Sequence, residues 1–205
     1  GLTLRARGIP PAEGARMLER INRLRRASTQ REAVYWNAAF KLGAGPDDPS
    51  RLLQEMIQGR KPGRALDAAM GRGRNAIYLA SVGWDVTGYD MAADAVAAAN
   101  EHASQAGVKL HTVVARHETF AFGENQWDLI VCLYNYMDPD DPKFPPLFQK
   151  ALRPGGIVVF QTAWDRNATL AQLIANWKGY RILRYEDLDA GVVTDEWRPS
   201  LTYPT

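Results

Sequence analysis

The sequence predicts an α/β fold, namely a Rossmann-like, doubly wound, mostly parallel sheet of six to seven strands with flanking helices, preceded by N-terminal helices. Three observations favour it. From residue 64 onward, short apolar segments alternate with helical ones, which is the pattern of βαβ units. A pair of glycines follows the first of these strands. The chain has 205 residues, 46% of them hydrophobic, enough for one such domain with additions.

Residues 1–32 are predicted to form a basic N-terminal arm, separate from a domain of residues 33–205. Eight arginines stand there against three glutamates, a net charge of +5, whereas the whole chain carries +2. A helix is expected after Pro10 and Pro11, with an apolar stripe at helical spacing. The stripe consists of Met17, Leu18, Ile21 and Leu24. The arginine face could bind a partner or an anionic surface, or the helix could simply pack on the domain.

The remaining elements follow in order. A helix is expected over residues 32–42, and another after Ser50, a good N-cap residue. The expected strands are 64–69, 84–89, 109–114, 127–133, 156–162 and 180–185, and the later helices are 75–81, 92–105, 147–152 and 170–177. Residues 192–205 contain two prolines, and we expect either a stub of a seventh strand at residues 201–203 or a chain that is truncated before that strand.

Composition excludes several classes of protein. No apolar run approaches the length of about 18 residues that a transmembrane helix needs. Cys132 is the single cysteine, so neither an internal disulfide nor a cysteine-based zinc site can form, and no metal is expected. A reducing, cytoplasmic location is the simpler interpretation, with N-terminal processing left open. The near-neutral charge argues against a uniformly basic nucleic-acid binder. Nothing indicates the oligomeric state.

The segment after the first strand has the features of a ligand-binding loop. Ala69, Gly71 and Gly73 are small enough to let a ligand approach the backbone closely. Amides at the start of the following helix could bind a carboxylate or a phosphate. The spacing of Gly71, Gly73 and Ala76 also fits a dinucleotide fingerprint, although glycine pairs before helices often serve only as tight turns.

Two carboxylates favour one ligand over another. Asp67 lies inside the loop motif, where it would repel a pyrophosphate but suit an ammonium group. Asp90 ends the second strand, 19 residues after Gly71, a position from which an acid can accept both ribose hydroxyls. A ligand with a ribose, an amino group and a carboxylate describes S-adenosylmethionine better than NAD. Alternatively, Asp67 only caps the following turn, and Asp90 only caps the helix at Met91.

At this point the chain resembles the class I S-adenosylmethionine-dependent methyltransferases. The resemblance rests on the Asp67-x-Ala69-x-Gly71-x-Gly73 motif and on three further segments, residues 83–90, 127–131 and 152–156. Within that class, residues 73–76 and 35–37 resemble the small-molecule branch related to tellurite-resistance and thiopurine-type methyltransferases.

The resemblance implies S-adenosylmethionine as cofactor, S-adenosylhomocysteine as product and a small-molecule acceptor. Gly71 and Gly73 would line the methionine portion, with Asp67 near its amino group, while Asp90 would hold the ribose and Met91 would lie against the adenine. The full set of implied cofactor-binding residues is Trp36, Asp67, Ala69, Met70, Gly71, Gly73, Asn75, Asp90, Met91, His117, Glu118, Cys132, Leu133 and Tyr134.

One position departs from the family's pattern. The family often has an acid beside the adenine amine after the third strand, where this chain has Arg116. The backbone of His117 or the side chain of Glu118 could substitute for it.

Methyl transfer from a sulfonium is an in-line displacement, for which the protein mainly supplies alignment. No catalytic base is therefore inferred, and Tyr134, Tyr136 and His117 remain candidates. An RNA or protein methyltransferase that docks through the basic arm, and a non-catalytic S-adenosylmethionine binder, are the alternatives. An NAD oxidoreductase is disfavoured by Asp67.

Overall fold

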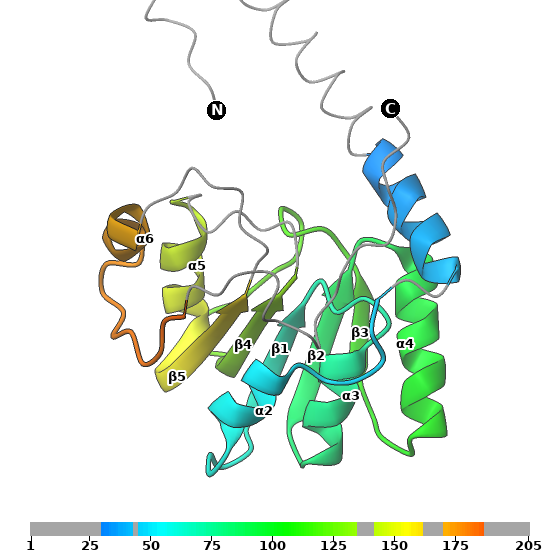
Figure 1. The fold of residues 1–205 in the computed structure, drawn as a ribbon, viewed down its shortest axis with the longest axis horizontal. Helices are drawn as coiled ribbons and strands as arrows, with labels where there is room; N and C mark the ends of the chain where they lie inside the picture. The colour runs from blue at the N-terminus through cyan, green and yellow to red at the C-terminus, as the bar shows by residue number, and fades with distance from the viewer. Residues whose placement is uncertain (1–29, 43–44, 135–141, 162–169, 187–205) are drawn as a thin grey trace, which may run out of the picture.

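The computed structural model describes residues 30–42, 45–134, 142–161 and 170–186. Its strands form one parallel sheet in the order β3-β2-β1-β4-β5 (Figure 1). The strands are β1 (Arg64–Ala68), β2 (Asp85–Asp90), β3 (His111–Val114), β4 (Trp127–Leu133) and β5 (Leu152–Gln161). The predicted α/β, mostly parallel architecture is confirmed, with five strands in the described residues instead of six to seven.

The sixth predicted strand is wrong. Residues 180–186 are described and form no strand. A strand exists only where its backbone groups meet a neighbouring strand, and the described residues contain no neighbour for this segment. Ile182, Leu183 and Tyr185 accordingly remain 51%, 47% and 47% exposed. The possible seventh strand, over residues 192–205, lies outside the described residues.

The helices agree with the predictions to within a few residues. They are a helix over residues 30–41, then α2 (Arg51–Ile57), α3 (Arg74–Ser81), α4 (Ala93–Gln105), α5 (Phe144–Ala151) and α6 (Leu170–Asn176). Helix α5 begins three residues earlier than expected because its first turn accommodates the prolines that follow Phe144. The predicted arm helix, in residues 1–29, lies outside the described residues. No helix of the described part has the length and apolarity needed to cross a membrane.

Two apolar layers enclose the sheet. On one face α2 and α3 supply Leu53, Ile57 and Leu79, which pack against residues of β1, β2, β4 and β5. On the other face α5 contributes Phe144 and Phe148. Because successive residues of a strand point to opposite faces, neighbouring residues of β4 belong to different layers. The sheet is thus covered on both sides, as parallel sheets are.

The helix over residues 30–41 packs beside α4 near the carboxyl ends of the strands (blue in Figure 1). Trp36 is buried there against the start of α4. The Asn37 Oδ1 atom accepts the backbone N–H of Asp94 at 2.9 Å, in the first turn of α4. Glu32 forms an ion pair with Arg116 at 2.8 Å. These contacts fix the helix above the edge of the sheet where ligands bind in such folds.

Candidate functional site

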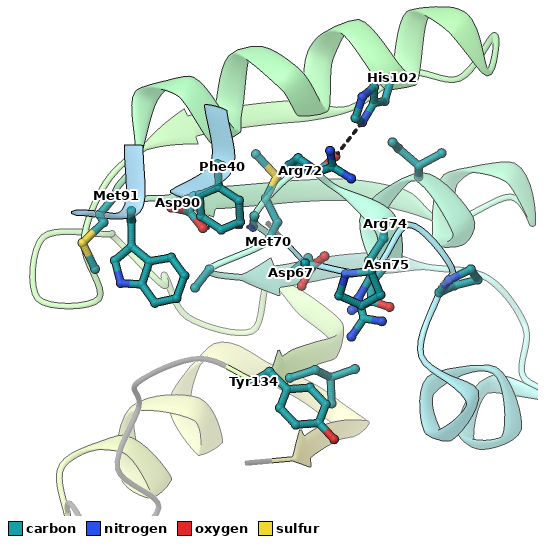
Figure 2. A pocket seen from close by; sticks show the side chains of 18 of the residues that line it. Phe40, Asp67, Met70, Arg72, Arg74, Asn75, Asp90, Met91, His102 and Tyr134 are labelled. Carbon is teal, nitrogen blue, oxygen red and sulfur yellow. Dashed lines mark hydrogen bonds between the residues drawn. The ribbon is translucent and has the colours of Figure 1, made fainter. Parts of the chain in front are cut away.

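A cavity of about 710 Å³ lies at the carboxyl ends of β1, β2 and β4. The helix over residues 30–41 and the loop over residues 45–49 cover it, and the loop over residues 69–72 forms its centre. Figure 2 shows side chains from these segments around the cavity. Open parallel sheets bind ligands at this edge, and the volume falls in the range of roughly 300–1,000 Å³ typical of small-molecule sites.

The central loop has an unusual backbone conformation. Ala69 and Gly71 both have φ of 55°, and Gly73 has φ of 86°. A Cβ atom on Gly71 would lie 3.1 Å from the ring of Phe40, so a side chain there would have to compete for the space above the loop. A Cβ atom on Gly73 would instead lie 3.0 Å from the Cβ atom of Ala99 in α4. Gly73 therefore allows helix packing and, against our expectation, does not line the cavity.

Asp67 is the most unusual ionisable group in the cavity. Its side chain is only 2% exposed. It accepts a hydrogen bond from the backbone N–H of Ala76, in the first turn of α3, but its Oδ2 atom has no partner within the described residues. Burial raises the pKa of Asp67 to about 7, against a lowering effect of Arg74. The expected capping of the following turn is thus present, and one carboxylate oxygen is still left over for a ligand.

Asp90 is buried as well, but its oxygens are used by the protein. Its Oδ2 atom accepts the N–H of Gly71 and its Oδ1 atom accepts the N–H of Ala92, both at 2.9 Å. Burial raises the pKa of Asp90, while hydrogen bonds from Ala92, Gly71 and Met91 oppose this. The helix-capping interpretation is therefore correct for Asp90. It does not exclude a ribose, since each carboxylate oxygen retains a second acceptor position.

The segment that follows β3 lines another part of the cavity, where His117 and Arg116 lie. The Tyr89 hydroxyl lies 2.7 Å from Nδ1 of His117, and burial lowers the pKa of His117. Arg116, whose position departs from the family's pattern, extends its guanidinium to Glu32 at 2.8 Å, Glu118 at 3.4 Å and the sulfur of Met91 at 3.2 Å. This arginine ties the covering helix to the cavity.

The end of β4 forms another wall. Leu133 and Tyr134 line the cavity, whereas Cys132 points to the opposite layer and is fully buried there. The Tyr134 backbone, with φ of 53°, donates its N–H to the carbonyl oxygen of Gln161 at 2.8 Å. The side-chain amide of Gln161 donates to the Tyr134 hydroxyl oxygen at 3.1 Å, which leaves the hydroxyl hydrogen available to a ligand. Tyr136 lies outside the described residues.

The cavity brings together most of the predicted cofactor-binding residues. Those that line it are Trp36, Asp67, Ala69, Met70, Gly71, Asn75, Asp90, Met91, His117, Glu118, Leu133 and Tyr134, and those that do not are Gly73 and Cys132. Cys132 faces the other layer because successive residues of a strand point to opposite faces, and it is its neighbour Leu133 that faces the cavity.

Sequence reasoning missed several residues that line the cavity, and four of them come from the covering helix, the central loop and α3. Phe40 lies one helical turn after Trp36 and covers Gly71, a position that the i,i+4 rule could have indicated. Arg72 and Arg74 line the cavity from the loop and from the first residue of α3. Tyr78 lines it from the next turn of the same helix.

Known proteins support the same class. A SAM-dependent methyltransferase from Leishmania major shares the fold, with a TM-score of 0.55 and 22% sequence identity over 65% of this chain and 62% of that one. Residues 65–156 match the family model described as a methyltransferase domain. Over these residues the chain is thus similar to the class I S-adenosylmethionine-dependent methyltransferases, the family that the sequence motifs also indicate.

Two curated relatives resemble parts of the chain. A ubiquinone biosynthesis O-methyltransferase from Pectobacterium carotovorum is 32% identical over 125 residues, which are 59% of this chain and 52% of the relative. A ribosomal RNA small subunit methyltransferase C from Alcanivorax borkumensis is 36% identical over 81 residues, 38% of this chain and 25% of the relative. The chain spans about half the length of the first relative and a quarter of the second.

The cavity also fits the cofactor of this class. S-adenosylmethionine carries a ribose and an α-amino acid, and at Asp67 the cavity offers a buried carboxylate oxygen that no other described residue hydrogen-bonds. Phe40 lies over Gly71 and adds an apolar surface to the cavity lining.

Proposed function

We propose that this chain transfers a methyl group from S-adenosylmethionine to a small-molecule acceptor. The observation that carries the proposal is the pair of buried carboxylates, Asp67 and Asp90, in one cavity at the carboxyl ends of adjacent strands. An acid at Asp67 suits the cofactor's ammonium group and would repel the pyrophosphate of NAD.

In this proposal the cofactor supplies an electrophilic methyl group on a sulfonium. The protein binds it in a fixed orientation and excludes water, which together supply most of what an in-line transfer needs. Trp36 and Phe40 lie over the cavity in the covering helix and provide apolar contact. The Tyr134 hydroxyl, oriented by Gln161, can donate a hydrogen bond to an acceptor.

The O-methyltransferase relative supports a small molecule with an oxygen nucleophile as the acceptor. The ribosomal RNA methyltransferase relative supports a second candidate, an RNA acceptor, but over a shorter segment. The first match covers 59% of this chain and the second only 38%. We therefore favour the small molecule, and we place the reaction in the cytoplasm on the ground of cysteine usage.

Titration calorimetry and a methyl-transfer assay test the proposal. S-adenosylhomocysteine should bind, and NAD should bind much more weakly. Labelled methyl groups from S-adenosylmethionine should then appear in a panel of phenols and thiols, and not in RNA or protein. Tighter binding of NAD would refute the cofactor, while binding of S-adenosylhomocysteine with transfer only to RNA would refute the acceptor class.

A further inference from the structure

The cavity imposes an order on the parts of a bound S-adenosylmethionine. Asp67, Asp90 and Met91 follow one another along it, as Figure 2 shows. With the ammonium group at Asp67 and the ribose at Asp90, the nucleobase must lie beyond Asp90, beside Met91. The guanidinium of Arg116 is 3.2 Å from the Met91 sulfur, and its neighbour His117 also lines the cavity. The turn after β3 is therefore the part of the chain that faces the base.

The acids near this turn are already paired. The Arg116 guanidinium, which stands where the family often has an acid, lies 2.8 Å from the carboxylate of Glu32 and 3.4 Å from that of Glu118. A base that bonded to either acid would have to compete with an ion pair. The imidazole of His117 is another polar group of the turn that lines the cavity.

A buried tyrosine holds that imidazole. The Tyr89 hydroxyl and Nδ1 of His117 share a hydrogen bond of 2.7 Å. Tyr89 is 1% exposed, and its ring stacks on that of Phe120 at a centroid distance of 4.2 Å. The backbone N–H of Phe120 donates to the carbonyl oxygen of Arg116 at 2.9 Å and closes the turn that carries His117. The imidazole is thus fixed at Nδ1, which leaves Nε2 and the ring face for a ligand.

The hydrogen bond between Tyr89 and His117 can run in either direction. A phenol hydroxyl both donates and accepts, and a neutral imidazole carries its hydrogen on either nitrogen. When Tyr89 donates, Nε2 carries the hydrogen, and when Tyr89 accepts, Nε2 is an acceptor. Burial lowers the pKa of His117 against the charges of Glu118 and Glu32, so the imidazole is neutral at pH 7.

We propose that the Tyr89–His117 pair is the nucleobase contact of this chain and that it accepts a purine with either an exocyclic amine or an exocyclic carbonyl oxygen. This inference rests on the proposed function. His117 touches the base, whereas Tyr89 is a positioning residue that acts through His117. An ionised carboxylate in the same place could only accept hydrogen bonds, so it would favour the amine and reject the carbonyl oxygen.

Two nucleosides test the tolerance of the pair in the wild-type chain. Methylthioadenosine carries the exocyclic amine, and methylthioinosine carries a carbonyl oxygen in its place. Titration calorimetry should give dissociation constants within about tenfold of each other, whereas loss of a hydrogen bond to a carboxylate would exceed that ratio. A larger preference for methylthioadenosine would overturn the inference.

Proton NMR tests whether the base lies beside His117. The chain has three histidines, and His117→Gln identifies the His117 signals by their loss. Methylthioadenosine should shift these signals, because a bound aromatic ring changes the magnetic environment beside it. The signals of His111 serve as an internal control, since His111 begins β3 at the other edge of the sheet and is exposed there. Unmoved His117 signals in the bound chain would refute the contact.

Tyr89→Phe tests the positioning role, because it removes the hydroxyl and keeps the ring. It should weaken methylthioadenosine about three- to tenfold, as expected for a lost neutral hydrogen bond. In a chain that already carries His117→Ala, the same change should alter the affinity less than about twofold. Tyr180→Phe is the matched control and should leave the affinity unchanged. It removes a hydroxyl from the same apolar layer, where that hydroxyl donates to the carbonyl oxygen of Pro145 at 2.7 Å.

Other results would overturn the inference in distinguishable ways. An equal loss with and without His117 would mean that Tyr89 does not act through the imidazole. An equal loss in Tyr180→Phe would assign the effect to the stability of the apolar layer. The comparison of the two nucleosides needs no variant, so it decides even if Tyr89→Phe fails to fold. If the wild-type chain binds neither S-adenosylhomocysteine nor methylthioadenosine, the proposed function itself is wrong.

Discussion

Asp67 should make both folding and cofactor binding depend on pH in a direction that is unusual for an aspartate. Burial raises its pKa to about 7, well above the ordinary value of an aspartate. The folded chain therefore holds a proton that the unfolded chain releases. The contribution of protonated Asp67 to the free energy of unfolding is fully present below about pH 4 and is lost as the pH rises through 7. Most paired aspartates stabilise proteins in the opposite direction.

The size of the effect follows from this pKa. Between pH 5 and pH 8 the folded Asp67 loses its proton while the unfolded one is already ionised, which corresponds to about 2–3 kcal/mol of stability. Asp67→Asn cannot ionise and keeps an oxygen that can accept the N–H of Ala76. We expect the free energy of unfolding of the wild-type chain to fall by about that amount relative to Asp67→Asn over this range. Urea unfolding at both pH values measures it.

The affinity for the cofactor should depend on the ionisation of the same carboxyl group, that of Asp67. An ammonium group next to Asp67 favours the ionised carboxylate, so S-adenosylhomocysteine should release nearly one proton at pH 6 and few at pH 8. Its affinity should rise about tenfold between these values. Calorimetry in buffers of different ionisation enthalpy counts the protons. His117 also titrates in the cavity. Methylthioadenosine has no ammonium group, so the protons that it releases on binding measure the contribution of His117 without that of Asp67.

Two results would refute this reasoning. If the wild-type chain and Asp67→Asn show the same pH dependence of stability, the carboxylate is not held protonated by burial. If S-adenosylhomocysteine and methylthioadenosine release the same number of protons, the ammonium group does not lie beside Asp67.

Three further predictions concern the rest of the cavity. Gly71→Val should abolish S-adenosylhomocysteine binding in calorimetry, because its Cβ would already lie 3.1 Å from Phe40; unchanged affinity would show that the ligand lies elsewhere. Asp90→Asn should weaken S-adenosylhomocysteine and methylthioadenosine equally, by about 1.5–3 kcal/mol, since both carry the ribose; a loss for only one of them would contradict the ribose assignment. Glu32→Gln should speed dissociation of S-adenosylhomocysteine about two- to fivefold in stopped flow, as expected for a partly exposed ion pair with Arg116; an unchanged rate would mean that this contact does not hold the covering helix.

The parallel sheet could be predicted from the sequence because the residues that identify each strand lie within that strand and the turns beside it. β1 and β4 are buried runs with strand composition, and each is bounded by turn residues. The segment over residues 180–185 has the same composition, yet it forms no strand. Whether an apolar run joins a sheet depends on a partner elsewhere in the chain, which composition does not reveal.

The site residues likewise divide into those that the local sequence predicts and those that depend on how distant elements pack. The motif placed Asp67 and Gly71 in the cavity because they follow one strand directly, and parallel strands end at a common edge. Phe40 and Arg74 were missed because their positions depend on how the covering helix and α3 pack. Gly73 was misplaced because a glycine can serve a ligand or a neighbouring helix, and only the distance to Ala99 distinguishes these uses.

The two carboxylates of the motif have different tasks, although the sequence treats them alike. Asp90 joins the loop at Gly71 to the first residues of α4 through both of its oxygens. A ribose bound there would therefore contact a group that already fixes the loop beneath the methionine portion. Asp67 keeps one oxygen that has no partner among the described residues, at a cost in stability that a cationic ligand removes. Asp90 thus shapes the site before the ligand arrives, whereas Asp67 gains a partner for its remaining oxygen only with the ligand, and the proton released on binding is expected to come from Asp67, beside the ligand's ammonium group.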